Sequence, residues 1–285
     1  MIALLSIPKS KSIEIVNVSY PSKIWYGDEF RIEWVCSGLN ETSSFLTIKG
    51  PREFTNVELE RDGNTFRWSP LVATSLVPGR YEANITCIDN ETSVSKSYEF
   101  VVRNLVLKIS EVSSNYEYIY EDDILTVEVD LKEISDTVVS VTDVEWKLFI
   151  DGKEVEKDAY YQTNWFLVTD LKKAGLNEGF HILKVVATYD DKQISNQTTI
   201  EVKPSLEVKI LSISPTEVKG GENITVKLSV TYHGIDILSH ENTELDVRLG
   251  KKEITNFWID DDKIIFEAPK LAAGEYSLKV KVTYN

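Results

Sequence analysis

The sequence contains no run of about 18 consecutive apolar residues, so nothing in it predicts a membrane-spanning helix. Cysteine, methionine and histidine are scarce, with two, one and three copies in 285 residues. The chain also lacks a Gly-x-Ser-x-Gly elbow, a phosphate-cradling glycine loop and a Cys-x-x-Cys pair. These absences argue against an enzyme, and we expect no catalytic residue, no cofactor and no metal.

Positive charge is also in short supply. The formal net charge is −15, with 46 acidic against 31 basic residues. Nucleic-acid backbones and anionic membrane surfaces would repel such a chain, which excludes them as expected partners. The composition, 42% hydrophobic and 27% charged, is that of a folded soluble protein.

Three glycine-led segments share one pattern, at residues 79–87, 179–187 and 274–282. After each glycine, apolar residues alternate with other residues, which is the period of a half-buried strand. The apolar face is formed by Tyr81, Ala83, Ile85 and Cys87, then His181, Leu183, Val185 and Ala187, then Tyr276, Leu278, Val280 and Val282.

A second motif precedes each of these strands, at residues 26–36, 120–131 and 220–230. Each copy is an acidic or glycine-containing turn that enters an alternating strand. Asp62-Gly63 and Asp151-Gly152 predict tight hairpins, and residues 169–175 predict one helical turn at most. Repeats of about 80–100 residues built from short strands predict an all-β fold of three tandem sandwiches in an elongated array.

The repeats set the expected boundaries. Residues 1–11 form an N-terminal strand or a processed segment, and the domains span residues 12–103, 104–203 and 204–285. Almost no linker remains at the two junctions, so the last strand of one domain should pass directly into the first strand of the next. Such a chain is expected to be a semi-rigid rod.

The third repeat is short. The first two repeats continue with a further strand, at residues 93–102 and 193–202, whereas the third stops at Asn285. Two interpretations follow: the chain is cut before its final strand, or another chain donates that strand. In the second case the apolar residues 2–7 would be the donor.

Cys36 and Cys87 lie on inward faces of the second and sixth predicted strands of the first domain, which resembles an immunoglobulin-like sandwich. This resemblance implies a disulfide that joins the two sheets. Two buried free thiols are the alternative. The chain departs from antibody domains, because Ile85 stands where they have a tyrosine and no tryptophan follows Cys36 before Trp68.

Together with residues 212–221 and 268–276, these features resemble the immunoglobulin-like repeats of archaeal and bacterial cell-surface proteins. The resemblance implies a surface protein with other surface proteins, or copies of itself, as partners.

Six Asn-x-Ser/Thr sequons occur, and a glycan attached to any of them would indicate a secreted protein. They are centred on Asn17, Asn40, Asn84, Asn90, Asn196 and Asn223. An oxidising compartment outside the cytoplasm would explain both the sequons and a disulfide. We therefore expect an extracellular or cell-surface location. The cytosol of a hyperthermophile is the competing setting.

Several other polar and aromatic residues can be interpreted either as structural residues or as functional ones. His181 is expected to be a packed structural residue, and His233, Asp236, His240 and Glu241 are weak zinc candidates. Acidic clusters at residues 121–123, 190–191 and 260–262 suit either calcium or, preferably, solvated turns. Tyr160, Tyr161 and Trp165 could stack on a sugar, although aromatic rings in a sandwich usually belong to the core.

The sequence therefore predicts a non-catalytic extracytoplasmic module, part of an envelope layer, adhesin, pilus or stalk. The alternative is a binding module, for example for a glycan, within a larger secreted protein.

Overall fold

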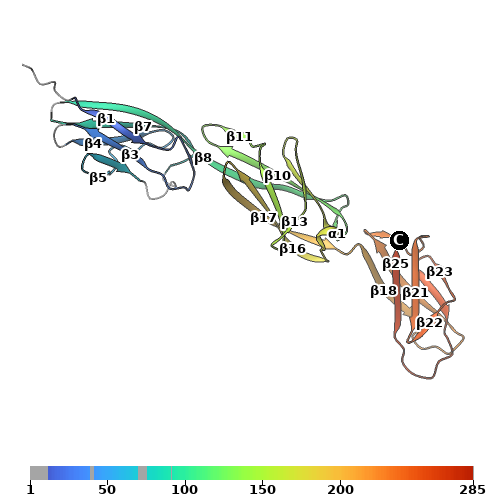
Figure 1. Cartoon of the computed structure of the whole chain (residues 1–285). Helices are drawn as coiled ribbons and strands as arrows, with labels where there is room; N and C mark the ends of the chain where they lie inside the picture. The colour runs from blue at the N-terminus through green and yellow to red at the C-terminus, as the bar shows by residue number, and fades with distance from the viewer. Residues whose placement is uncertain (1–11, 39–41, 70–75, 91, 285) are drawn as a thin grey trace, which may run out of the picture.

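Three β-sandwiches follow one another along an elongated molecule in the computed structural model (Figure 1). The structure describes residues 12–38, 42–69, 76–90 and 92–284. Residues 1–11, which include the proposed donor segment, lie outside this set. Each sandwich pairs two sheets around its own apolar core, and the all-β prediction is confirmed.

The first sandwich packs two four-stranded layers around Trp34, Tyr81 and Phe100, which are buried. One layer has the order β1 (Glu14–Ser19), β3 (Ile32–Ser37), β6 (Thr65–Trp68) and β5 (Glu60–Asp62). The facing layer contains β4 (Ser43–Lys49), β7 (Gly79–Ile88), β8 (Ser93–Ser113) and β2 (Lys23–Trp25).

The second sandwich repeats this plan. One layer consists of the far half of β8 with β10 (Ile124–Ile134), β15 (Trp165–Asp170), β14 (Asp158–Tyr161) and β11 (Val138–Ser140). The other has the order β13 (Lys153–Val155), β12 (Glu145–Ile150), β16 (Gly179–Tyr189), β17 (Lys192–Lys203) and β9 (Ile119–Tyr120).

The third sandwich has the same first layer but a narrower second one. The first contains β18 (Leu206–Ser214), β19 (Asn223–Tyr232), β24 (Lys263–Glu267), β23 (Phe257–Asp260) and the short β20 (Ile235–Asp236). The second consists of β22 (Lys252–Ile254), β21 (Thr243–Leu249) and β25 (Leu278–Tyr284).

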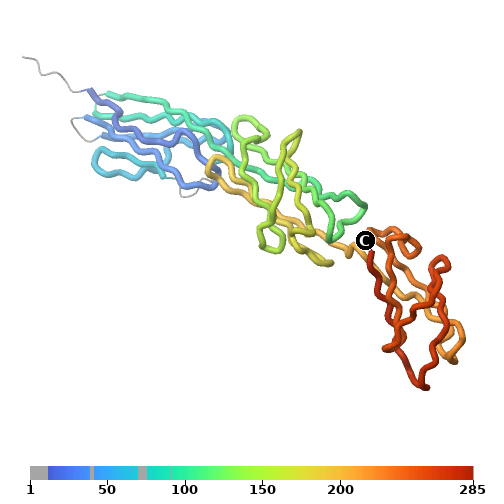
Figure 2. The backbone as a smooth tube through the Cα atoms, turned by 45° about the vertical axis from the view of Figure 1, so that its right-hand side comes forward, coloured from blue at the N-terminus to red at the C-terminus, as the bar shows by residue number. Residues whose placement is uncertain are grey.

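Strand β8 is the central feature of the fold. Its 21 residues pair with β7 in the first sandwich and with β10 in the second, so one eight-stranded sheet extends through both. The smooth backbone trace shows the same uninterrupted passage (Figure 2). Strand β17 ends at Lys203 and β18 begins at Leu206, so the second junction is almost as short.

The structure confirms the hairpin predicted at Asp151-Gly152 and the single helical turn predicted within residues 169–175. The hairpin at Asp151-Gly152 has positive φ at both residues, 50° and 80°, which is the twist that a two-residue turn requires. Among the residues that the structure describes there is one helix, α1 (Leu171–Ala174), and it is one turn long. Asp170 caps its first turn, and Gly175 ends it at φ 71°.

One tertiary feature was not predicted from the sequence. Tyr81 Oη donates a hydrogen bond to the carbonyl oxygen of Val77 (3.0 Å), and Tyr276 Oη donates to that of Ala272 (2.7 Å). Both bonds reach four residues back across the corner before the glycine-led strand, as in the tyrosine corner of immunoglobulin folds. His181 takes this place in the second sandwich, with Nε2 2.9 Å from the oxygen of Asn177.

Candidate functional site: the two interdomain joints

At the first joint, Arg103 is the centre of a buried polar network. Its side chain is only 7% exposed, and its Nε and Nη2 atoms donate to the two carboxylate oxygens of Glu133 at 2.8 and 2.7 Å. Its Nη1 atom donates to Asp190. The hydrogen bond with Glu133 raises the pKa of Arg103, outweighing burial, so the guanidinium stays charged.

Aromatic rings from both sandwiches enclose this guanidinium. The Cζ atom of Arg103 lies 4.1 Å from the ring centroid of Trp25 and 5.7 Å from that of Tyr189. Trp25 belongs to the first sandwich but packs against the core of the second. A further ion pair, Lys192 Nζ to Asp28 Oδ1 at 2.5 Å, also links the two sandwiches.

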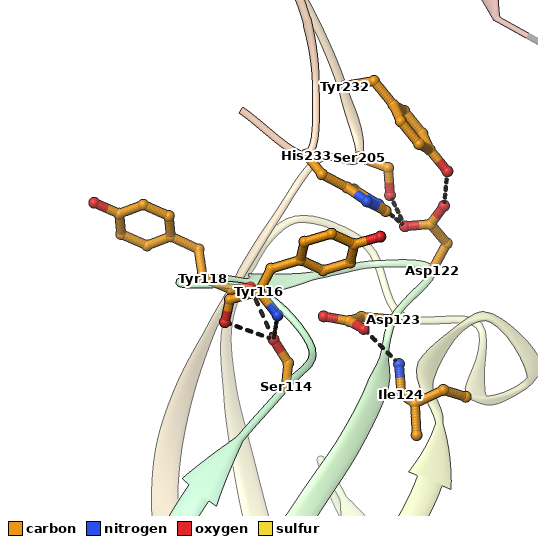
Figure 3. A network of polar contacts seen from close by, with 9 residues as sticks. All are labelled: Ser114, Tyr116, Tyr118, Asp122, Asp123, Ile124, Ser205, Tyr232 and His233. Atoms are coloured by element: carbon orange, nitrogen blue, oxygen red, sulfur yellow. Dashed lines mark hydrogen bonds and ion pairs between the residues drawn. The ribbon is translucent and has the colours of Figure 1, made fainter. Parts of the chain in front are cut away.

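At the second joint, Asp122 takes the central place (Figure 3). Its Oδ1 accepts from His233 Nε2 at 2.8 Å and from the hydroxyl of Ser205, and its Oδ2 accepts from Tyr232 Oη at 2.8 Å. Burial alone would raise the pKa of Asp122, but these three hydrogen bonds prevail and lower it to about 2. Burial, and then the bond to this carboxylate, raises the pKa of Tyr232 to about 12.

Rings also close the second joint. The ring centroid of His233 lies 4.2 Å from the ring centroid of Tyr116, 4.6 Å from that of Tyr120 and 4.1 Å from that of Tyr232. Lys203 Nζ lies 3.0 Å from the ring centroid of Tyr118. Both joints therefore bring an ionised side chain, Arg103 or Asp122, together with aromatic rings at the contact between two sandwiches.

Acids at both joints follow the short parallel strands β2 and β9. Asp28 and Asp122 each bind the following sandwich. They are not equivalent, because the residue that matches Asp28 is Asp123: the amides of Asp28 and Asp123 donate to the carbonyl oxygens of Trp25 and Tyr120. The expectation of a solvated turn at residues 121–123 is wrong, because Asp123 is 3% exposed and Asp122 lies at the joint. The acidic turn before an alternating strand marks these segments in the sequence, but it does not show which acid reaches the next sandwich.

Cys36 and Cys87 form a disulfide, with Cα atoms 5.8 Å apart, so the alternative of free thiols is wrong. The bond joins β3 of one layer to β7 of the other, and both cysteines are completely buried. This is the pairing that the immunoglobulin resemblance implied.

The sequon asparagines fall into two groups. Asn17, Asn90 and Asn223 are exposed, whereas Asn84 and Asn196 are half-buried. Asn196 donates its side-chain amide to the carbonyl oxygen of Leu107 (3.0 Å), and the Oδ1 atom of Asn84 is buried. Asn40 lies outside the described residues.

The aromatic candidates do not form one platform. Tyr161 is paired across the strands with Trp165, and Tyr160 with Phe166, so the two tyrosines point to opposite faces of β14. Tyr160 and Tyr161 are 44% and 38% exposed. Trp165 is half-buried, and its Nε1 donates to the carbonyl oxygen of Val141 at 2.7 Å.

The histidine and acidic candidates are used internally. His181 binds Asp151 and Asn177, and His233 binds Asp122. Asp262 pairs with Lys227 at 2.7 Å. Within the described ranges, no group of three or more His, Cys, Asp or Glu side chains could hold a metal ion. No helix in the same ranges is long and apolar enough to cross a membrane.

The repeated layer order and the corner bonds define immunoglobulin-like sandwiches. Residues 209–284 match the family model of the IPT/TIG domain. This immunoglobulin-like family model therefore covers the third sandwich. No curated protein sequence matches the chain.

Solved tandem immunoglobulin structures are similar at low identity. The I-band fragment I67–I69 of titin is 13% identical, with a TM-score of 0.48, over 95% of this chain and 94% of that one. The full ectodomain of mouse nectin-like molecule 4 is also 13% identical, with a TM-score of 0.32, over 92% and 95%. A D1–D4 ectodomain fragment of ICAM-5 has the same identity and TM-score over 96% and 75%.

Proposed function

We propose that this chain is a non-catalytic rod of an extracytoplasmic surface assembly, which holds whatever it carries at a fixed distance and orientation. The observation that carries the proposal is the passage of β8 through the first joint without a linker. A 21-residue strand paired on both sides of the joint cannot swivel unless its hydrogen bonds break.

The charged networks support the same role. A flexible tether would solvate its joints, whereas here Arg103 is 7% exposed at the first joint and the side chain of His233 is 7% exposed at the second. Moving either joint would leave a charge or a ring nitrogen buried without its partner, which is unfavourable.

Small-angle X-ray scattering of the monomeric chain tests the rod directly. The expected curve is that of one elongated body, fitted by a single rigid arrangement of the three sandwiches. A curve that requires an ensemble of freely rotating sandwiches would contradict the proposal.

For the location, the disulfide and the three exposed sequon asparagines support an oxidising extracytoplasmic setting. The intact mass of the protein from its native source, with and without reduction before thiol alkylation, tests it. Sugar increments, and alkylation only after reduction, are expected. An unmodified mass with freely alkylated thiols in the unfolded chain would contradict the location.

A glycan-binding module is the alternative, but the split of Tyr160 and Tyr161 between opposite faces gives it little support. A glycan-array signal lost in Trp165→Ala would favour it over the rod.

A further inference from the structure

The outward face of strand β16 is apolar where the equivalent strands of the other two repeats are polar. Leu183, Val185 and Ala187 point into the second core, so the alternate residues face outward. These outward residues are Phe180, Ile182, Lys184 and Val186. The equivalent residues are Arg80, Glu82, Asn84 and Thr86 in the first repeat, and Glu275, Ser277, Lys279 and Lys281 in the third. The second sandwich therefore carries an apolar strip that its neighbours lack.

A hollow of about 450 Å³ lies over this strip. Its apolar surface comes from Phe149 on β12 and from Ile182 and Val186 on β16. Val186 lies outside the core cluster and is still only 7% exposed, so the side chains around the hollow cover it. Ile182, in contrast, is 50% exposed. A hollow of this size, apolar at its base and lined by a few polar groups, is typical of sites for small ligands.

Four polar side chains surround the apolar base. Lys184 lies between Phe149 on β12 and Gln197 on β17, and Lys147 lies opposite Val186. Gln193 completes the set. The side chains of both lysines and both glutamines form no ion pair or hydrogen bond with any residue that the structure describes. The hollow therefore offers two free ammonium groups and two free amides.

Asp151, the one acid among the described residues that line the hollow, is already bound. Its Oδ1 atom accepts from the backbone amide of Ile182 at 2.8 Å, and its Oδ2 atom lies 2.7 Å from Nδ1 of His181. It is therefore not available to neutralise the two lysines, and a ligand with a negative charge would meet them unpaired.

The position of β16 in its sheet disfavours a peptide strand as the ligand. β16 is paired with β12 on one side and with β17 on the other, so it has no edge to which an extended peptide could add. Recognition must come from the side chains. Amides both donate and accept hydrogen bonds, as sugar hydroxyls do, and an aromatic ring beside them can pack against the apolar face of a pyranose.

We propose that this hollow binds a carboxylated sugar at the end of a glycan. Lys147 and Lys184 are diagonal neighbours across β12 and β16, so both side chains reach one carboxylate. Gln193 and Gln197 bond the hydroxyls, and Phe149 packs against the ring. The site adds a ligand to the rod and does not depend on the rigidity of the joints.

The net charge of −15 limits the ligand to a short acid. At physiological ionic strength salt screens charges beyond about 8 Å, so the two lysines dominate inside the hollow. A long polyanion would also meet the acidic surface around it and would be repelled. One acidic sugar on an otherwise neutral glycan avoids that repulsion.

NMR titration of the full chain with a trisaccharide that ends in glucuronic acid tests the site. Saturating shifts are expected in the backbone amides of residues 182–186 and in the side-chain amides of Gln193 and Gln197. The same trisaccharide ending in glucose should bind at least about tenfold more weakly, because it lacks the charge-assisted bonds to the lysines.

Variants separate the site from general charge effects. Lys184→Gln should weaken binding of the acidic trisaccharide at least about tenfold. Lys279→Gln, at the equivalent position of the third sandwich, is the matched control and should bind as the parent does. Ile182→Ser places the residue of the third repeat in the strip and should weaken binding without unfolding the chain, since Ile182 is half exposed.

The absence of saturating shifts, equal affinity for the glucose-ended trisaccharide, or equal losses in Lys184→Gln and Lys279→Gln would overturn the site. Equally tight binding of a tetraglutamate peptide would reject a sugar as the ligand. None of these outcomes bears on the rod, because its scattering curve is measured without the trisaccharide.

Discussion

The Nε2 atom of His181 lies 2.9 Å from the carbonyl oxygen of Asn177, in the place where the other two sandwiches have a tyrosine hydroxyl. Its Nδ1 atom lies 2.7 Å from Asp151 Oδ2. Both ring nitrogens face acceptors, so the doubly protonated imidazolium satisfies both bonds. The bond to Asp151, opposed by partial burial and helped by Asn177, raises the pKa of His181.

The stability of the second sandwich should therefore depend on pH. Because the folded-state pKa lies above the ordinary value of 6.5, the stabilisation is complete below that pH and is lost as the pH rises through the folded-state pKa. His181→Tyr should remove this dependence while it keeps the corner bond, which is worth about 1 kcal/mol. Urea unfolding between pH 5 and pH 9 measures both effects. His240→Tyr is the control, and an unchanged pH profile in His181→Tyr would contradict the assignment.

Replacement of Arg103 should loosen the first joint and destabilise the chain. Arg103→Met leaves Glu133, 13% exposed, without its partner, at a cost on the order of 3 kcal/mol. Arg80→Met is the matched control across the same joint, because Arg80 is 58% exposed and pairs with Asp136 at 3.4 Å. Its effect should be much smaller, because both partners are exposed to solvent. If Arg103→Met and Arg80→Met lowered the free energy of unfolding equally, the buried network would stabilise the chain no more than an exposed ion pair.

The contribution of the Asp122 carboxylate to the second joint should persist to low pH. The pKa of Asp122 is lowered to about 2, so its contribution is present above the ordinary value of 3.8 and is lost as the pH falls through about 2. Asp122→Asn removes the charge and should broaden the distance between the second and third sandwiches at neutral pH. Spin labels at Lys153→Cys and Lys252→Cys, both exposed, measure that distance. Asp260→Asn should leave the distribution narrow, and a narrow distribution in Asp122→Asn would refute the role of the carboxylate.

Reduction should destabilise the first sandwich. The Cys36–Cys87 bond closes a loop of 51 residues, which corresponds to about 4 kcal/mol in the loop-entropy model. The double variant Cys36→Ala with Cys87→Ala should unfold at lower urea than the parent, and reductant should not shift it further. A reductant effect in that variant would point to a different cause.

Glycan attachment should follow exposure and not the sequon alone. In a secreting, glycosylating host, Asn17, Asn90 and Asn223 should be occupied and Asn196 should not, because its amide is bonded to Leu107. Glycopeptide mass spectrometry measures the occupancy, and Thr225→Ala removes the Asn223 sequon as a control. Equal occupancy at Asn196 and Asn223 would contradict the rule.

Strand patterns and turns of the first two sandwiches could be predicted from local sequence alone. Alternation of period two requires that residues such as Ala83, Ile85 and Cys87 share one side of a strand, and all three are buried. Asp151-Gly152 and the cap at Asp170 are local signals, since their conformations depend on neighbouring residues only.

The joints, in contrast, could not be predicted from the sequence. Asp122 and His233 are more than a hundred residues apart, and no periodicity of either segment shows that one sandwich will lay its turn against the next. The same holds for Arg103, whose burial depends on Trp25 and Tyr189 arriving from different sandwiches. Strand patterns are set by short-range sterics and solvent, whereas a joint is set by which surfaces remain after each core has formed.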